Sequence, residues 1–293
     1  MERMLWKKLV RWIGKIAKQK FNPRHQFSDN EIIAIYFWSV IHDRPVSWAC
    51  QSINWESASR RRTLPSNTTM SRRLRSPAVR TRVLELERRL LRATDSSGLV
   101  WFMDGKPLVI GGCSKDRQAG YGRAACSKAK GYKLHAIIGA DHSIPQWRIA
   151  PMNVDERKMA RRMLRVAEIR GYVAADSNYD SNELHAICDL RGNLQLVVAR
   201  RYGPQRGHGH RKQTPGRMRS KAILEDPYSQ FGLDLLTQRV AIERDYGNLS
   251  NWGGGLTHLP PWVRTHRRVH RWVQAKLIIN AIRRQVQQTT YVN

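Results

Sequence analysis

The stretch LVWFMD, residues 99–104, places five consecutive apolar side chains directly before an acid. A short, unbroken apolar run is typical of a strand that is buried on both faces of a helix-covered sheet. The stretch YVAAD, residues 172–176, repeats the pattern, so Asp104 and Asp176 each follow an apolar strand. If the two strands are neighbours, the two carboxylates lie side by side at one edge of the sheet.

Around these two strands, the sequence predicts an α/β domain over residues 96–293. Three adjacent strands are followed by helices and strands in alternation, which indicates a mixed five-stranded sheet flanked by helices. The other expected strands are 132–140, 146–150 and 194–199, and the expected helices are 155–169, 182–190, 232–249 and 262–288. The last helix has an apolar residue at every third or fourth position, which predicts that it packs on the sheet.

Residues 1–95 predict a small all-α domain. Ser28 and Glu31 form a capping box before the apolar run IIAIYFWSVI, and Ser66 is placed to cap a later, basic helix. Short helices that end in a basic one resemble a helix-turn-helix module that binds DNA. The residues of the basic helix expected to contact DNA are Arg72, Arg73 and Arg75. A solvated helix of an ordinary bundle explains the same residues.

The first 20 residues are apolar and basic, which predicts an amphipathic helix. This helix either packs on the protein or lies on a membrane surface. No secretory signal is expected, and the four cysteines form no C-x-x-C pair. Reduced thiols in a cytoplasm, without a membrane partner, are therefore expected.

The charge of the chain is strongly basic, with 52 Lys and Arg against 23 Asp and Glu and a formal net charge of +29. Both expected domains share the excess, because residues 1–95 hold 20 basic and 8 acidic residues. Such a charge favours a polyanionic partner through counterion release. Residues 200–229 are predicted to form a basic loop, since Gly, Pro and basic residues dominate its first part.

Paired carboxylates at a sheet edge suit a divalent cation. Acids held roughly 4–6 Å apart repel each other, and Mg²⁺ prefers hard carboxylate oxygens as ligands. A third acid would complete two metal sites, roughly 3.5–4 Å apart, for displacement at phosphorus. Glu243 is the candidate, with Arg239 on the same helix face to hold a phosphate. An intrahelical ion pair between Arg239 and Glu243 explains the same spacing.

Three segments resemble, in order, the blocks around the acids of DDE transposases of bacterial insertion sequences. They are FMDGKPL, AADSNYDS and RVAIERDYGNL. The resemblance implies an RNase H-like catalytic domain, in which Asp104, Asp176 and Glu243 are catalytic. It also implies that these acids bind two Mg²⁺ ions, for which Mn²⁺ can substitute.

Further residues extend the resemblance. Tyr179 belongs to the Tyr-Asp that often follows the second acid, and it would pack beside the site or contact DNA. Leu236 and Ser250 stand where one branch of the family has a Tyr and a Lys that handle the DNA end, which puts a hairpin mechanism in doubt. Arg267 and Arg268 are candidates to contact DNA in their place.

The expected function is that of a DNA transposase. It would bind the double-stranded ends of its insertion sequence, cleave them with Mg²⁺ and join them to target DNA. The resemblance implies a homodimer on DNA, in a bacterial cytoplasm and associated with the nucleoid. One alternative is a catalytically inactive, repurposed DNA-binding protein. Another is a structure-selective nuclease on the same fold that cuts without strand transfer.

Overall fold

The computed structural model divides the chain into two compact units. Unit 1 comprises residues 1–91, 249–256 and 271–293, and unit 2 comprises 92–248 and 257–270. The sequence predicted one domain over 96–293, whereas the contacts group its C-terminal segments with the N-terminal helices. The residues that the structure describes are 2–16, 25–55, 63–92, 98–111, 113–124, 127–198, 214–251, 256 and 258–291.

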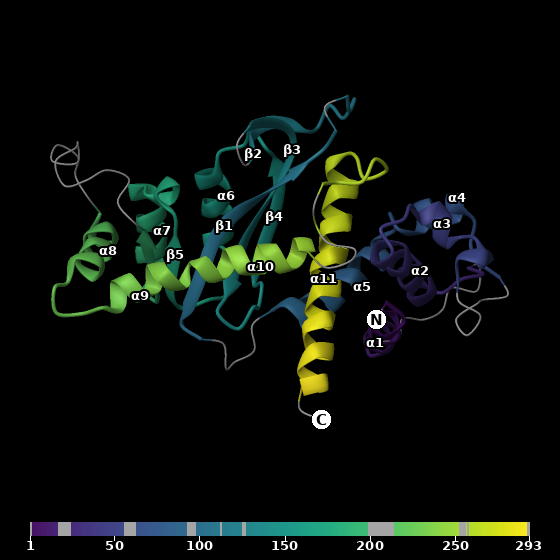
Figure 1. The fold of residues 1–293 in the computed structure, drawn as a ribbon, viewed down its shortest axis with the longest axis horizontal. Coiled ribbons are helices and arrows are strands. Elements are labelled where there is room, and N and C mark those ends of the chain that lie inside the picture. The colour runs from purple at the N-terminus through teal and green to yellow at the C-terminus, as the bar shows by residue number, and fades with distance from the viewer. Residues whose placement is uncertain are drawn as a thin grey trace. The chain divides into compact units, whose positions relative to one another are not determined.

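Unit 1 is helical throughout its described part (Figure 1). Its elements are α1 Glu2–Gly14, α2 Asp29–Ile41, α3 Val46–Ala49, η1 Ser52–Asn54, α4 Asn67–Arg73, α5 Pro77–Leu91 and most of α11 His266–Tyr291. The predicted capping box is confirmed, since Ser28 Oγ accepts from Glu31 N and Glu31 accepts from Ser28 N. Helix α1 buries one apolar face, including Trp6 and Leu9, so it packs on the protein.

Three tryptophans form the centre of unit 1. Trp38 stacks on Trp55 with ring centroids 4.9 Å apart, and Trp6 meets both rings edge-on. The indole of Trp6 donates to Ala34 O, and that of Trp55 donates to Ala49 O. The buried indole N–H groups therefore have partners, and the aromatic faces contribute their full apolar area to the core.

Three arginines in and directly after α4 look equivalent in the sequence but differ in burial. Ser66 caps the helix as predicted, accepting from Thr69 N at 3.1 Å. Arg72 and Arg75 are exposed, as a DNA-contacting face requires. Arg73 is buried and donates to Phe27 O at 2.8 Å and to Asp29 Oδ1 at 2.6 Å. This corrects the expectation that Arg73 contacts DNA, because its guanidinium is engaged inside the unit.

Helix α11 also differs from the prediction. It begins at His266 rather than 262, and from Arg271 onward it packs in unit 1 rather than on the sheet. Lys276, in the part of α11 that packs in unit 1, is 3% exposed. Its ammonium donates to Val40 O at 3.0 Å and to the carboxylate of Asp43.

The stability of unit 1 should rise with pH above about 8. Burial lowers the pKa of Lys276 from 10.5 to about 8, although Asp43 acts in the opposite direction. Between these values the unfolded chain binds a proton that the folded chain does not, so deprotonation favours folding. At about 1.4 kcal/mol per pH unit, the gain approaches roughly 3 kcal/mol. Urea unfolding at pH 8 and pH 10 should show this rise in the wild type, and Lys276→Met should lack it. An identical pH dependence in both proteins would contradict the assignment.

Unit 2 is built on a mixed sheet of six strands, one more than predicted. The strands are β1 Val100–Val109, β2 Gly120–Ala124, β3 Ser127–Gly139, β4 Gln146–Pro151, β5 Gly171–Ala175 and β6 Leu194–Val198. The order is β2-β3-β1-β5-β6, and β4 also pairs with β3. The strand missing from the prediction is β2, whose sequence GYGRA lacks an apolar pattern.

Strand β1 is longer than its apolar run. It pairs in parallel with β5 only from Val100 to Met103, but it pairs antiparallel with β3 as far as Val109. Asp104 therefore lies within β1, at the point where the neighbour β5 ends, rather than at the end of the strand. Gly171 begins β5 with φ 93°, and a Cβ there would lie 2.2 Å from Leu99 O, so this position requires glycine.

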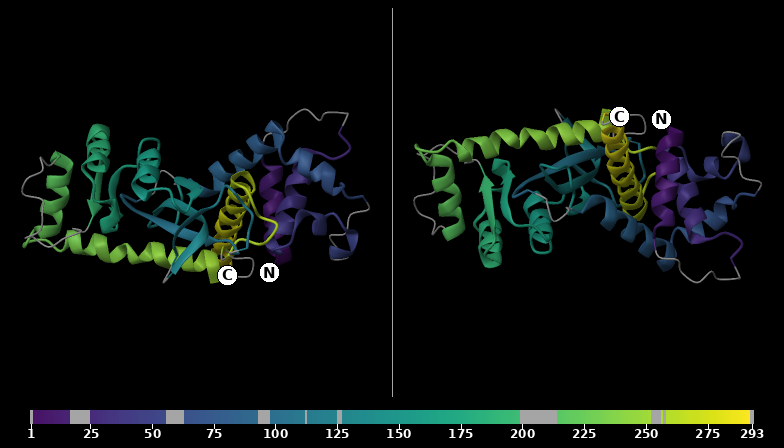
Figure 2. Two further views of the ribbon diagram at one scale, coloured as in Figure 1. Left: turned by 90° about the horizontal axis from the view of Figure 1, so that it is seen from above. Right: turned by 90° about the horizontal axis from the view of Figure 1, so that it is seen from below.

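Helices cover both faces of the sheet (Figure 2). Helices α6 Glu156–Leu164 and α7 Asn182–Arg191 lie on one face, with the short η3 Ser177–Tyr179. Helices α9 Phe231–Gln238 and α10 Val240–Asn251 lie on the other, and they break at Arg239 where one helix was predicted. The predicted basic loop 200–229 is wrong in part, because α8 Pro215–Glu225 forms behind the cap Thr214. Its first part, up to 213, lies outside the described residues.

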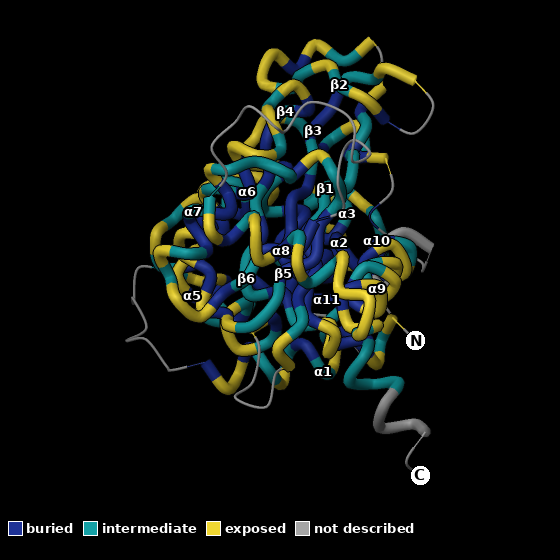
Figure 3. Tube along the Cα trace, turned by 90° about the vertical axis from the view of Figure 1, so that its left-hand side faces the viewer, coloured by how far each residue is buried: buried dark blue, intermediate teal, exposed yellow. Residues whose placement is uncertain are grey.

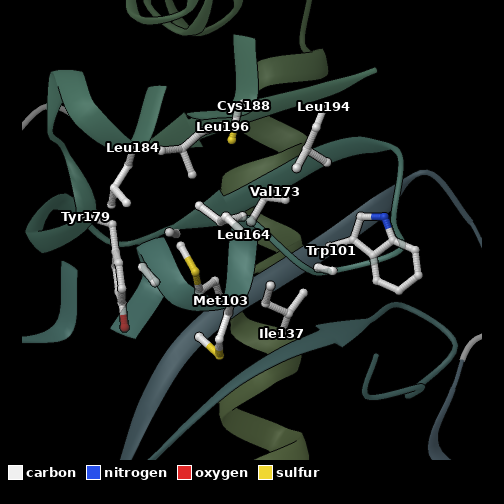
Figure 4. Packing of buried hydrophobic residues seen from close by; sticks show 14 of the residues in the cluster. Trp101, Met103, Ile137, Leu164, Val173, Tyr179, Leu184, Cys188, Leu194 and Leu196 are labelled. Carbon is white, nitrogen blue, oxygen red and sulfur yellow. The ribbon is translucent and has the colours of Figure 1, made fainter. Parts of the chain in front are cut away.

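The core of unit 2 lies between the sheet and helices α6 and α7. Trp101, Met103 and Val173 from the strands pack against Leu164 and Leu184 from the helices (Figure 4). Strands β5 and β6 are largely buried, whereas α9 is largely exposed on its outer side (Figure 3). Among the described residues, no helix has both the length and the apolar character needed to cross a membrane.

Candidate active site

The register of β1 and β5 brings the two aspartates together. Met103 is paired with Ala175, so the next residue of each strand is Asp104 and Asp176. Met103 faces the core under α6, and side chains alternate along a strand, so Asp104 within β1 is directed to the opposite face, whereas Asp176 follows the end of β5. Asp176 caps η3 and accepts from Asn178 N at 2.9 Å, which fixes its carboxylate. The predicted pair of acids is thus present at one sheet edge.

Negative charge is crowded around Asp104. Burial raises the pKa of Asp104 to about 6, and the charges of Asp176 and Glu156 act in the same direction. A backbone hydrogen bond from Gly105 and the charge of Arg239 oppose the rise. A carboxylate in such surroundings is stabilised in its charged form by a nearby cation.

Helix α10 is fixed beside these acids. The hydroxyl of Tyr246 donates to the backbone oxygen of Asp104 at 2.9 Å. The buried carboxylate of Asp245 meets His142 Nδ1 at 2.8 Å. Glu243 precedes Tyr246 by three residues and therefore shares its side of the helix. The third expected acid thus lies on the helix and the side that contact Asp104.

The carboxylate of Glu243 is not joined to the aspartates in this structure. Its side chain is 60% exposed and lies 4.0 Å from Arg239 Nη2, the ion pair that was the alternative explanation of the spacing. Within the parts of the chain that the structure describes, no three His, Cys, Asp or Glu side chains are close enough together to hold a metal ion. The geometry therefore assembles two of the three expected ligands.

These two ligands fit a divalent cation. Both are carboxylates, and the pKa of Asp104 is raised by burial and by the neighbouring negative charges, a condition that a cation relieves. Oxygen ligands of this kind suit Mg²⁺, which keeps several waters and takes substrate phosphates as further ligands. Both side chains are only partly buried, so a phosphate can approach them.

The residues expected to contact DNA differ in how far their side chains are buried. Tyr179 is fully buried in the core under α6, which favours the packing alternative over contact with DNA. Arg267 and Arg268 are exposed in the first turn of α11. Arg239 is partly buried between α9 and α10, and its charge acts on Asp104.

Three residues near the aspartates were missed from the sequence. Lys106 follows Asp104 in β1, and its ammonium lies 5.9 Å from the ring centre of Tyr246. Glu156 lies in the first turn of α6, its charge acts on Asp104, and it pairs with Lys133. The available signal was the polar residue Lys133 within the apolar strand β3.

Comparison with known proteins gives a family for this site. The family model described as transposase DDE domain matches residues 95–280. A search of curated proteins found no matching relative. The matched stretch covers more than half of the chain and contains Asp104, Asp176 and Glu243. The six-stranded mixed sheet flanked by helices is consistent with an RNase H-like DDE domain. The chain therefore belongs to the family of transposases with a DDE domain.

Proposed function

We propose that this chain is an active DNA transposase that binds the ends of its insertion sequence and catalyses Mg²⁺-dependent hydrolysis and strand transfer. The observation that carries the proposal is that Asp104 and Asp176 directly follow the last paired residues of β1 and β5, Met103 and Ala175. Asp104 is held within β1, and Asp176 is held directly after β5 by its hydrogen bond from Asn178 N. Membership of the family supports the transposase activity.

Asp104 and Asp176 would hold the cation, and Glu243 would join them when DNA is bound. When bound, Mg²⁺ would activate the attacking water or 3′-hydroxyl and stabilise the leaving oxygen at phosphorus. Arg239 would release Glu243 and hold a phosphate of the DNA, since guanidinium pairs well with phosphate oxygens. Arg239 lies at the break between α9 and α10, so a rotation of its side chain would release the side chain of Glu243 while Tyr246 keeps α10 in place.

The basic surfaces would hold the DNA. Arg72 and Arg75 in unit 1 and Arg267 and Arg268 in unit 2 are exposed, and the chain has a net charge of +29. Exposed cations bind the phosphate backbone largely without regard to sequence. Two ends must be held at once, which favours a homodimer on DNA, and a DNA substrate favours the bacterial nucleoid as its location.

A catalytically inactive, repurposed DNA-binding protein is the second candidate. The observation in its favour is the position of Glu243, which is exposed and paired with Arg239 rather than joined to the aspartates. Such a protein would keep its affinity for DNA and lose dependence on metal.

Glu243→Gln should reduce cleavage of element ends by about a hundredfold or more, because a neutral amide is a poor cation ligand. DNA affinity should stay within about twofold. The measurement uses the full chain, linear DNA carrying the inverted repeats that flank the gene, and Mg²⁺. Released 3′ ends and joined products are resolved on a gel.

Asp234→Asn is the matched control, since Asp234 is an exposed acid on the preceding helix α9. Cleavage at the wild-type rate by Glu243→Gln would remove Glu243 from the site. A wild-type chain that binds the ends but neither cuts nor joins them would support the inactive alternative. Cutting without joining would support the nuclease.

A further inference from the structure

Glu156 is positioned by the start of α6. Asp155 caps this helix, accepting from Arg157 N at 2.7 Å and from Lys158 N at 3.3 Å. The helix packs on β3, β4 and η3. Glu156 is the first residue of α6, so its carboxylate is presented at the end of the helix that lies next to the sheet.

Lys133 binds Glu156 across the face of β1. Lys133 lies on β3, its ammonium donates to Glu156 Oε1, and both side chains are largely buried, at 12% and 24% exposed. A Cβ on Gly105 would lie 2.8 Å from Lys133 Cδ, so the lysine stem crosses β1 directly over Gly105. Gly105 follows Asp104, at the point where β1 has lost its neighbour β5. The ion pair is therefore adjacent to Asp104, on the open side of β1.

Two buried tyrosines mark the space between these groups. Tyr179 approaches from the α6 face, is 0% exposed, and its hydroxyl has no hydrogen-bond partner in the described part of the chain. Tyr246 approaches from the α10 face and contacts Asp104. The charges of both Glu156 and Asp104 raise the pKa of each tyrosine, in addition to the larger effect of burial. Glu156 and Asp104 thus both lie near the two tyrosines, and among the described residues no three acids yet converge on a cation.

We propose that Glu156 is a fourth acid of the catalytic site, which binds the cation together with Asp104 and Asp176, and that Lys133 holds it in the absence of the cation. This inference rests on the proposed function. Three carboxylates in a partly buried site repel one another, and an ammonium removes part of that repulsion. Lys133 and the cation would then compete for the same carboxylate. A lysine released by the cation would be free to bind a DNA phosphate.

The competition predicts opposite effects for the two halves of the ion pair. Glu156→Gln should weaken Mn²⁺ binding to the full chain by about tenfold or more, in the range seen when a metal-site residue is lost. Lys133→Met should leave the affinity unchanged or increase it, because Glu156 no longer has a competing partner. The affinity is measured without DNA, from the electron paramagnetic resonance signal of free Mn²⁺.

Glu183→Gln is the matched control, because Glu183 also lies in the first turn of a helix and pairs with an arginine, Arg161. It should bind Mn²⁺ as the wild type does. Glu156→Asp keeps the charge but shortens the side chain, so affinity should fall by severalfold if the carboxylate contacts the cation. Full affinity in Glu156→Asp would show that only charge matters and would overturn the proposal.

Further outcomes are decisive. Glu156→Gln within about twofold of the wild type would overturn the inference, as would equal losses in Glu156→Gln and Lys133→Met, which would indicate a purely structural ion pair. If Glu156→Gln fails to fold, Lys133→Met and Glu156→Asp decide the result in the same way. Asp104→Asn distinguishes a failure of this inference from a failure of the proposed function. If Asp104→Asn loses Mn²⁺ affinity and Glu156→Gln does not, only the role of Glu156 is rejected. If Asp104→Asn keeps its Mn²⁺ affinity, the metal site itself is rejected.

Discussion

Asp104→Asn should reduce metal-dependent cleavage of element ends by at least about a thousandfold and leave DNA binding intact. The substitution keeps the shape of the side chain and removes the charge that a cation requires. A bound metal contributes several kcal/mol to displacement at phosphorus, and each 1.36 kcal/mol is a tenfold change in rate. Asp176→Asn should act similarly, since Asp176 directly follows Ala175, the residue paired with Met103 beside Asp104. Single-turnover cleavage rates and fluorescence anisotropy with labelled ends measure the two quantities.

The control for these variants is Asp141→Asn, an exposed acid in the turn after β3 that accepts hydrogen bonds from the backbone N–H and the hydroxyl of Ser143. It should cut at the wild-type rate. Wild-type cleavage by Asp104→Asn would place the chemistry elsewhere in unit 2. A parallel loss of DNA binding would instead indicate a folding defect, which the circular dichroism spectrum of the variant would reveal.

The sequence predicted that the two aspartates lie side by side, but it did not predict how β1 brings Asp104 there. The apolar run ends at Met103, so the sequence predicted that the strand ends there. Strand β1 continues to Val109, because antiparallel pairing with β3 requires backbone groups rather than apolar side chains. Pro107 is tolerated because β1 has no neighbour on its other side there, as at an edge strand. Asp104 therefore lies within β1, beside the point where β5 ends, and is only partly buried.

Contacts between distant segments explain the strand and the helix that were missed. In β2, a Cβ on Gly122 would lie 2.5 Å from Met152 O, so glycine is required by a backbone some thirty residues away. No pattern within GYGRA reports that contact. Helix α8, in contrast, had a local signal, since Thr214 caps it and Pro215 occupies its first position. The density of basic residues concealed that signal.

The sequence alone could distinguish only some of the acids near the site from other acids of the chain. Glu156 follows a helix cap, and a first-turn acid there has an ordinary explanation in the helix dipole. Its second contact, with Lys133, joins residues 23 positions apart and depends on how α6 packs on the sheet. Glu243 was chosen through family resemblance, and in the structure its carboxylate lies beside Arg239 rather than beside the aspartates.

Arg73→Met should lower the free energy of unfolding of unit 1 by about 3 kcal/mol. The guanidinium is 6% exposed and the carboxylate of Asp29 is 17% exposed, so the substitution leaves a charge that water can hardly reach. Breaking a buried pair from one side costs roughly 3–5 kcal/mol, because the remaining charge is uncompensated. The backbone oxygen of Phe27 also loses its donor. Urea unfolding followed by tryptophan fluorescence measures the change, since three tryptophans form the core of this unit.

Arg72→Ala is the control one residue away, and it should behave in the opposite manner. Arg72 is exposed, so stability should change by no more than about 0.5 kcal/mol. If it binds a phosphate, its loss should weaken DNA binding and reduce the slope of log affinity against log salt by about 0.9. Should Arg73→Met weaken DNA binding at unchanged stability, Arg73 would have to leave Asp29 and turn toward the DNA. The DNA-binding surface of α4 would then include Arg73, which is buried in this structure.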